Sequence, residues 1–433
     1  MDTLAIMLGA IGAALRRRQP ARSDGGVVLV CSPAASVDDL HALLVAAVLH
    51  SQRQLRLAAV VATGARGAPR AEASAALARC VLAQLGVTDV PVAVGTDAFV
   101  RAVDAHLADG ACARAAALAA ALSAEGVGAR GADAGFASGQ TLLVALLRGA
   151  ADHSLTLVCL SALTDVCALL RAAPDLCRAK VRELVLSGGA RRHGGGWVAD
   201  ESAPANAEDP AAAAFVYATC LAPDAPSPSS AAAAAAGARG PALAVVSRAS
   251  VPPIPLQLAR SFAARSREPL LRALAAGQAA SFQRLSADAT PADDADAMPA
   301  DAQLTRYLSP AGASCLLLLL PSCAHALPAA ESAMVDRRHR LFLAPRHRLP
   351  ADVLQRVIRD CYHHAILLAY DARAAAPKRH AGASTIGAAV CALYGNAGAP
   401  APPSAASAAS AAADGDQSAA RACVPQPLSL IHI

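Results

Sequence analysis

The stretch that decides the fold is Val27–Leu44, which reads VVLVCSPAASVDDLHALL. Its first five residues are apolar and mostly β-branched, which predicts a buried strand. A loop of small residues follows, and Leu40, Leu43 and Leu44 then recur at helical spacing. The order strand, tight turn and helix is typical of one unit of an α/β fold.

An acidic pair, Asp38 and Asp39, stands between that loop and the apolar helix positions. Either carboxylate could cap the helix by accepting from its unpaired N–H groups, and negative charge suits that end of the helix dipole. The same position also places the pair at the carboxyl end of a strand, where open α/β sheets bind ligands. The spacing alone leaves both interpretations open.

Alternating apolar runs and amphipathic segments continue along most of the chain. Strands are predicted at 55–63, 90–94, 155–160, 183–186, 242–246 and 341–343, and helices at 71–85, 116–122, 141–147, 163–170, 177–181, 211–220, 259–285 and 351–368. This rhythm predicts an α/β fold with a mostly parallel sheet covered by helices on both faces.

Composition and charge limit the classes of function. The chain has 433 residues, of which 55% are hydrophobic and only 3% aromatic. A formal charge of +5 is small for this length, and no basic stripe alternates with aromatic residues, so we expect no nucleic-acid partner. The longest strongly apolar run, Leu316–Leu320, is far shorter than a membrane-spanning helix, so no membrane partner is expected.

The twelve cysteines show neither zinc-site spacing nor a C-x-x-C pair. Several fall inside predicted strands or helices, such as Cys31, Cys159 and Cys361, and we interpret them as small buried residues of a reducing compartment. The expected location is the cytoplasm. Mitochondrial targeting is the alternative, because Arg16–Arg18 follow an apolar segment near the N-terminus.

The predicted domain organisation has three parts. Residues 1–25 form an N-terminal extension, residues 26–370 form one domain, and residues 371–433 form a low-complexity tail. Two Ala/Pro-rich insertions interrupt the domain at about 223–240 and 287–302. The last six residues, LSLIHI, can be encoded by a transposon end used in sequencing libraries, which favours an artefactual C-terminus over an ordinary tail.

Several pieces of the sequence, in this order, carry a resemblance to a known family. They are VDDLHALL (37–44), VTDVPVAVG (87–95), LTLVCLSALTDV (155–166), ELVLSGGA (183–190), EDPAAA (208–213) and RLFLAP (340–345) with the helix after it. Together they resemble the inosine-uridine-preferring nucleoside hydrolases, whose opening signature is Asp-x-Asp-Pro-Gly-x-Asp-Asp after an apolar strand. The resemblance implies a nucleoside-hydrolase-like α/β fold and a role of the purine-salvage kind.

The family hydrolyses the N-glycosidic bond of ribonucleosides around a bound calcium ion. Such a reaction needs a water to attack the anomeric carbon, a metal to activate that water and a carboxylate to take its proton. In the family's signature, Ser32 stands at the first Asp and Ala34 stands at the second, which is the proton acceptor and a calcium ligand. The final pair survives, and the resemblance implies that Asp38 holds a ribose hydroxyl and Asp39 binds calcium.

Other family positions are changed as well. Ala65 replaces an Asn after the second strand, and the metal-binding carbonyl after the fourth strand would come from Leu160. Counting back from Asp209-Pro210 places Ala203-Pro204-Ala205 on the family's Glu-Phe-Asn and Trp197 on an earlier Asn. A slip of one residue would bring Asn206 into the substrate site. The family's His-Asp-Pro aligns best with Leu308-Ser309-Pro310.

Three hypotheses follow. The first is a degenerate nucleoside hydrolase with little or no activity, without a catalytic base at Ala34 and with weak or absent calcium. The second is an active purine or pyrimidine nucleosidase whose base comes from elsewhere, such as Asp200 or Glu201. The third is a non-catalytic protein that binds a sugar or nucleotide or acts as a scaffold. The expected partner is a ribonucleoside or another ribose-like small molecule, and a homo-oligomer is compatible with each hypothesis.

Overall fold

The computed structural model describes residues 25–65, 71–97, 138–221, 240–252, 311–320, 323, 330–333, 336–347 and 350–375. Within these residues one sheet has eight strands, which are β1 (Val27–Cys31), β2 (Leu57–Gly64), β3 (Val92–Asp97), β4 (Leu155–Cys159), β5 (Val181–Ser187), β8 (Ala242–Val246), β9 (Glu331–Ala333) and β10 (Asp336–Phe342). Their order across the sheet is β3-β2-β1-β4-β5-β8-β10-β9. Neighbouring strands run parallel, and only β9 pairs in antiparallel fashion, with β10.

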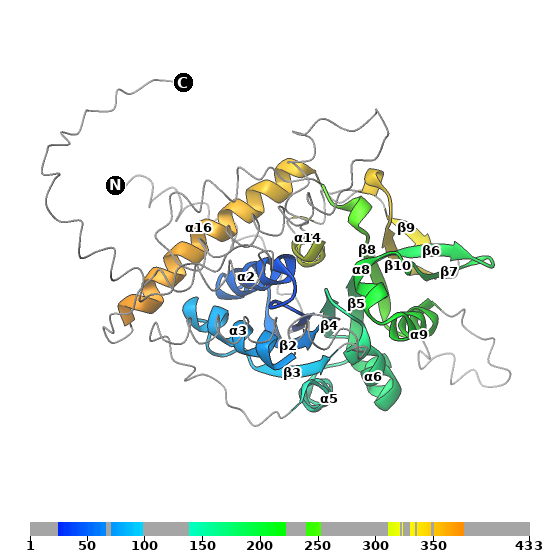
Figure 1. Ribbon diagram of the computed structural model, residues 1–433, viewed down its shortest axis with the longest axis horizontal. Coiled ribbons are helices and arrows are strands. Elements are labelled where there is room, and N and C mark those ends of the chain that lie inside the picture. Colours follow the sequence, from blue (N-terminus) through cyan, green and yellow to red (C-terminus); the bar gives the residue numbers. More distant parts are fainter. Residues whose placement is uncertain are drawn as a thin grey trace, which may run out of the picture. The chain divides into compact units, whose positions relative to one another are not determined.

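Helices cover both faces of the sheet (Figure 1). One face carries α2 (Val37–Ser51), α3 (Ala71–Gln84), α14 (Ala311–Leu317) and α16 (Ala351–Ala375). The other face carries α5 (Gly139–Gly149), α6 (Thr164–Ala172), α7 (Pro174–Lys180) and α9 (Pro210–Leu221). The shorter elements are α8 (Pro204–Glu208), η2 (Arg248–Ser250) and η3 (Pro345–His347).

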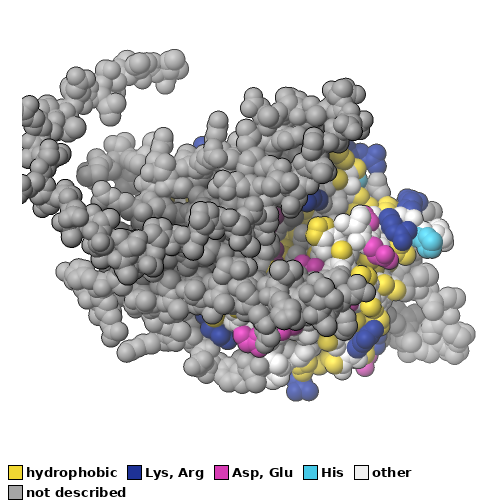
Figure 2. All heavy atoms as spheres, in the orientation of Figure 1, with side chains coloured by type: hydrophobic (Ala, Val, Ile, Leu, Met, Phe, Trp, Pro, Cys, Tyr) yellow, Lys and Arg dark blue, Asp and Glu magenta, His cyan; other side chains and the backbone are white. Residues whose placement is uncertain are grey.

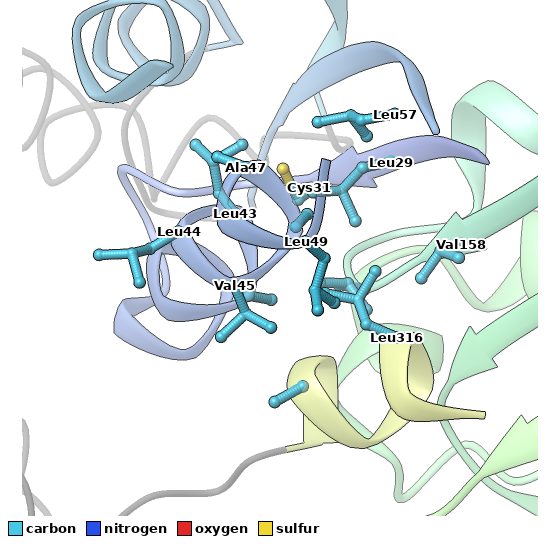
Figure 3. Close-up of a cluster of buried hydrophobic side chains, with 14 of the residues drawn as sticks. Leu29, Cys31, Leu43, Leu44, Val45, Ala47, Leu49, Leu57, Val158 and Leu316 are labelled. Carbon is cyan, nitrogen blue, oxygen red and sulfur yellow. The ribbon is translucent and has the colours of Figure 1, made fainter. Parts of the chain in front are cut away.

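Strand β1 contributes to both hydrophobic cores, which explains why it has no polar position. Leu29 and Cys31 pack on the side of α2 and α14, whereas Val28 and Val30 pack on the opposite side with α5, α6 and α9. Figure 3 shows part of the first core, with Leu29 and Cys31 close to the side chains of α2. A parallel strand that is buried on both faces needs a continuous apolar run, because each side chain enters one core or the other.

The strand order reverses between β1 and β4. From β1 the chain moves by way of α2 to β2 and β3 on one side, and β4 then returns to the other side of β1. A crevice outside the carboxyl ends of the strands forms at such a switch point and is the usual ligand site of open α/β sheets. Ser32 and Leu160 are the first residues after β1 and β4, so both lie at this point.

A two-stranded hairpin, β6 (Ala190–His193) and β7 (Gly196–Ala199), follows β5 and forms a separate antiparallel sheet. Figure 1 shows it projecting from the body beyond β8. Gly194 and Gly195 connect the strands with φ values of +58° and +82°. Two positive φ angles suit the tight turn of a two-residue hairpin loop, and glycine adopts them without strain.

The structure confirms the predicted α/β fold with a mostly parallel sheet and helices on both faces. The sequence analysis did not predict the β6–β7 hairpin, α8, α14 or β9. The predicted helices 116–122 and 259–285, the extension before residue 25, the two insertions and most of the tail lie outside the described residues. The boundary at residue 370 stays a prediction, and α16 continues past it to Ala375.

All described residues belong to one compact unit, Met1–Gly395, and a second unit, Asn396–Ile433, lies outside them. The nine cysteines within the described ranges are free thiols and buried, as their apolar surroundings in the sequence predicted. No helix in the described parts of the chain is long and apolar enough to span a membrane.

Candidate active site

The candidate site lies at the switch point, where the chain leaves β1 and β4. The two strand ends are joined directly, since the backbone N–H of Leu160 donates to the Val30 carbonyl at 2.9 Å. Next to this bond, the hydroxyls of Thr63 and Ser161 lie 2.7 Å apart and are both buried. The floor of the site is therefore built from neutral groups that satisfy one another.

Helix α2 begins beside the site, and its cap differs from the prediction. Ser36 is the N-cap, and its hydroxyl accepts from the backbone N–H of Asp39 at 3.3 Å. Asp38 and Asp39 lie in the first turn, so neither carboxylate is the N-cap, which was one of the two interpretations that the spacing left open. Serine takes the cap because its short side chain reaches the third helical N–H, and the acids still suit the helix dipole from the first turn.

Asp39 points back toward the end of β1. Its Oδ2 accepts from the backbone N–H of Ser32 at 2.7 Å, and the residue is only 6% exposed. Burial raises the pKa of Asp39 to about 6, although hydrogen bonds from Ser32 and Ser36 lower it in part. The carboxylate is thus already engaged with the chain's own backbone.

The positions that the resemblance aligns with the family's metal and base carboxylates carry small side chains without charge. Ser32 is 1% exposed, and its hydroxyl lies 3.5 Å from the hydroxyl of Ser74 on α3. Ala34 is also 1% exposed and belongs to the hydrophobic core beneath α2. A methyl group there can neither bind a cation nor accept a proton.

Asp38 and Leu160 lie at the border between α2 and α14. Asp38 is partly exposed and has interactions of its own. Gly312 of α14 lies so close that a Cβ on it would stand 2.9 Å from the Leu160 side chain and 2.7 Å from Cβ of Ala42. Helix α14 therefore forms one wall of the site. Ser309, which aligns with a family carboxylate, lies outside the described residues.

Asn206 of α8 lies on the β5 side of the site and ties two segments together. Its Nδ2 donates to the carbonyls of Gly189 and Asp200, both at 2.9 Å, and the residue is 1% exposed. Its Oδ1 and the Tyr217 hydroxyl would each lie 3.1 Å from a Cβ on Gly188. The amide nitrogen thus has a structural role, and contact between Asn206 and a substrate stays a prediction.

Glu208 is a functional candidate that the sequence analysis did not single out. Its Oε2 is buried and has no hydrogen-bond partner among the described residues. Burial raises the pKa of Glu208 to about 7, and the nearby charge of Asp39 adds to the increase, whereas a hydrogen bond from the Ala162 backbone lowers it. Two carboxyl groups, Asp39 and Glu208, therefore face the same edge of the sheet.

A signal for Glu208 was present in the sequence, because it precedes Asp209-Pro210, the start of α9. Asp209 caps that helix by accepting from the Ala212 N–H at 3.0 Å, and its other oxygen accepts from the Thr164 hydroxyl at 2.7 Å. The residue before such a cap is fixed in position, so an acid there is held against the end of β4.

The two acids that were considered as a relocated base lie farther along the β5 side. Asp200 accepts from the backbone N–H and the hydroxyl of Ser202 at 3.0 and 2.8 Å. Glu201 is exposed. Trp197, aligned with a family Asn, lies on β7 and packs against the second core.

The donor set at the switch point fits calcium poorly. Calcium takes six to eight oxygen ligands, several of them charged. In the described ranges no group of three or more His, Cys, Asp or Glu side chains is arranged to hold a metal ion. Of the positions that the resemblance aligns with the family's calcium-binding carboxylates, Asp39 alone keeps a carboxylate, and one of its oxygens accepts from the Ser32 N–H.

Comparison with solved structures places the fold among known proteins. The effector protein XOO4466 is 23% identical with a TM-score of 0.59, and the alignment covers 83% of this chain and 98% of that one. The type III effector protein XopQ in complex with adenosine diphosphate ribose is 22% identical with a TM-score of 0.59 and the same coverage. An inosine-uridine preferring nucleoside hydrolase from Bacillus anthracis is 13% identical with a TM-score of 0.48, and covers 78% and 99%.

No curated protein sequence matches the chain. The family model described as inosine-uridine preferring nucleoside hydrolase matches residues 28–247, which is more than half of the chain and runs from β1 to the residue after β8. The switch point between β1 and β4, the acids of α2 and the Asp-Pro start of α9 all lie within the matched part. The chain therefore belongs to the inosine-uridine preferring nucleoside hydrolase family.

Proposed function

We propose that this protein binds a ribose-containing small molecule at the switch point but has lost most or all of the family's hydrolytic activity. The observation that carries the proposal is the corner between β1 and α2. There the Asp39 carboxylate accepts from the Ser32 N–H at 2.7 Å, and Ala34, which the resemblance aligns with the family's base, is buried. One oxygen of the Asp39 carboxylate is therefore already engaged by the backbone.

The loss of the base alone is costly. A positioned general base typically contributes about 10²–10⁴ in rate, and a methyl group at Ala34 contributes none of it. The loss of metal carboxylates at Ser32 and Ser309 removes activation of the water and a grip on the ribose hydroxyls. These groups act as one unit, so their separate losses need not add.

Calcium is expected to bind weakly or not at all. Of the calcium ligands that the resemblance implies, one oxygen of Asp39 and the Leu160 carbonyl remain, since the Ser32 hydroxyl lies against Ser74 in a buried position. Two donors fall far short of the six to eight that the ion takes.

A ribose-containing ligand is the substrate class that the site still suits. The family acts on ribonucleosides, and one structural neighbour, XopQ, was solved with adenosine diphosphate ribose. Asp38 is partly exposed at the first turn of α2, and the resemblance places it at a position that holds a ribose hydroxyl. We assign Asp38 this role, with Asn206 as a second candidate on the opposite wall.

The test is an assay of base release from inosine and uridine with and without millimolar calcium. We expect no release above background from the purified full chain. The triple variant Ser32→Asp, Ala34→Asp and Ser309→Asp should recover calcium binding, measured by calorimetry, before it recovers turnover. Calcium-dependent hydrolysis by the unmodified protein would refute the proposed loss of activity.

Glu208 favours one alternative, an active nucleosidase with a relocated base. Its Oε2 is buried without a partner in the described structure, and a pKa of about 7 suits proton transfer near neutral pH. Asp200 is engaged by Ser202 and Glu201 is exposed, so neither is as well placed. If turnover is found, Glu208→Gln should remove it and the matched control Glu201→Gln should retain it.

A further inference from the structure

Helix α14 packs against α2 and against the end of β4. Cys315 and Leu316 are buried in the first core, and Figure 3 shows Leu316 in one cluster with Val158 of β4 and with side chains of α2. Helix α2 carries Asp38 in its first turn, and β4 leads directly to Leu160. Helix α14 therefore bridges the two segments that border the candidate site.

Gly312 is the residue at which the backbone of α14 meets both segments. A Cβ built on it would stand 2.7 Å from Cβ of Ala42 and 2.9 Å from Cδ1 of Leu160. It would also stand 3.5 Å from the carbonyl oxygen of Asp38. Carbon atoms in contact lie about 3.5–4.0 Å apart, so the first two distances leave no room for a side chain. The absence of a side chain at Gly312 is what permits this close approach.

The two short distances differ in what could relieve them. Cδ1 of Leu160 ends a flexible side chain and can rotate away, whereas Cβ of Ala42 is fixed to the backbone of α2. An alanine in place of Gly312 would therefore displace α14 from α2 by about 1 Å. Ala42 lies four residues after Asp38, on the same face of α2, so the gap would open beside Asp38.

The next turn of α14 lies near the second acid of α2. Burial raises the pKa of the Cys315 thiol, and the nearby charge of Asp39 adds to the increase. Cys315 follows Gly312 by three residues and is fully buried. A displacement of α14 would thus change the surroundings of Asp39 as well as those of Asp38.

We propose that Gly312 is a positioning residue of the ribose site: its bare backbone lets α14 close against α2 and so sets the width of the site between Asp38 and Leu160. The inference rests on the proposed function, because it concerns the same bound ribose. Gly312 needs no contact with the ligand for this role. It acts through the wall that it positions, and a binding site whose supporting elements are displaced by about 1 Å binds less well.

The experiment is calorimetric titration of the full chain with inosine, for the wild type and for Gly312→Ala. We expect the variant to bind inosine at least about tenfold more weakly, because α14 is displaced beside Asp38. Its thermal midpoint should fall by about 5 °C, since an extra methyl group in a packed core destabilises the fold. That fall alone would show only that Gly312 is packed, so the affinity is the decisive measurement.

Gly26→Ala is the matched control, because it introduces the same kind of clash at the other end of the strands. A Cβ on Gly26 would stand 2.8 Å from Cβ of Ala58 and 3.3 Å from Cδ2 of Leu155. Gly26 directly precedes β1, whereas the site lies beyond the carboxyl end of that strand. We expect a similar fall in the thermal midpoint and an unchanged affinity for inosine.

A second control, Gly195→Ala, adds a methyl group without a clash, because nothing lies within 4 Å of its Cβ. Gly195 is in the turn of the β6–β7 hairpin, which projects from the body in Figure 1. Basic side chains are exposed at that place in Figure 2. We expect this variant to bind inosine as tightly as the wild type.

The clash with Ala42 can be removed from the other side. Ala42→Gly takes away the methyl group that the new side chain would meet at 2.7 Å. In the Ala42→Gly background, Gly312→Ala should therefore leave the inosine affinity nearly unchanged. Such a rescue identifies contact between the two helices as the cause, because independent effects of the two substitutions would simply add.

The outcomes separate the positioning role from the proposed function. Equal weakening in Gly312→Ala and Gly26→Ala, or no weakening in either, would overturn the role of Gly312 and leave the ribose site standing. If the wild type binds no inosine, the proposed function fails. Alkylation of Cys315, followed by mass spectrometry, then tests the packing alone. Faster alkylation in Gly312→Ala than in Gly26→Ala would support the position of Gly312, and equal rates would refute it.

Discussion

The corner after β1 and the hairpin after β5 follow two strands of one sheet, and their charged side chains differ in what they contact. In the corner, Asp39 is 6% exposed and bonded to the Ser32 backbone. On the hairpin, Arg191 is exposed and has no polar partner in the described structure. A charge that the fold already satisfies has little to offer a ligand, whereas an unsatisfied one does.

The largest expected effect is on the pH dependence of stability, which tests whether Asp39 is buried in the corner between β1 and α2. The pKa of Asp39 rises from 3.8 to about 6 on folding, so the folded state binds this proton more tightly than the unfolded state. The free energy of unfolding should therefore fall as the pH rises from about 4 through 6, by about 3 kcal/mol at about 1.4 kcal/mol per pH unit. Urea unfolding of the wild type and Asp39→Asn across pH 4–7 measures this contribution as a difference.

His41 must be separated from that result, because it acts in the opposite direction. Its burial against Tyr362 lowers its pKa to about 4, so its contribution to stability is full above about 6.5 and is lost as the pH falls toward 4. Glu208, with a pKa of about 7, adds to the effect of Asp39. If Asp39→Asn shows the same pH profile as the wild type, the corner does not bury a carboxylate as described.

A smaller effect is expected from the hydrogen bond itself. At pH 5, where Asp39 is mostly protonated, Asp39→Ala leaves the buried Ser32 N–H without an acceptor and should cost about 1–3 kcal/mol of unfolding free energy. Asp39→Asn keeps an acceptor in the same place and should cost less than about 1 kcal/mol. Equal losses in the two variants, measured by thermal unfolding, would show that the Ser32 contact is unimportant.

The smallest effect is expected at the turn of the β6–β7 hairpin, where a substitution should have little influence on the packing of the rest of the domain. Gly195→Ala places a side chain at φ +82° and should cost about 1 kcal/mol through backbone strain alone, because nothing lies within 4 Å of the new Cβ. Gly194→Asn is the matched variant, since asparagine tolerates φ near +58°. A loss of several kcal/mol for Gly195→Ala would mean that the hairpin packs more closely than it does here.

Much of the fold was predictable because the strands of a buried parallel sheet appear in the sequence as runs of apolar residues. β1 and β4 are short, largely apolar runs that are buried on both faces, so Val27–Cys31 was placed with the correct bounds. The hairpin was missed because ARRHGGGWVA has no apolar alternation, and its strands have only four residues each. Its stability comes from its anchored base, which no local pattern reveals.

The site was harder to predict than the sheet. The family signature located Asp38, Asp39 and Leu160, which the structure does bring to the switch point. Ser36 was passed over as the cap, because a serine and an acid only two positions apart are equally good cap candidates in a sequence. Glu208 matches no functional position of the signature, and only the fold shows that it approaches Asp39.

The nine buried thiols provide a way to observe local unfolding of this protein. Burial raises the pKa of Cys31 and Cys361, and both side chains are almost fully shielded from solvent. Neither thiol should therefore react with an alkylating reagent while the native packing around it is intact. Labelling then requires local unfolding, and its rate reports the free energy of each opening. Cys31 lies in the central strand and Cys361 in α16. A faster modification of Cys361 would show that the last helix detaches before the sheet separates.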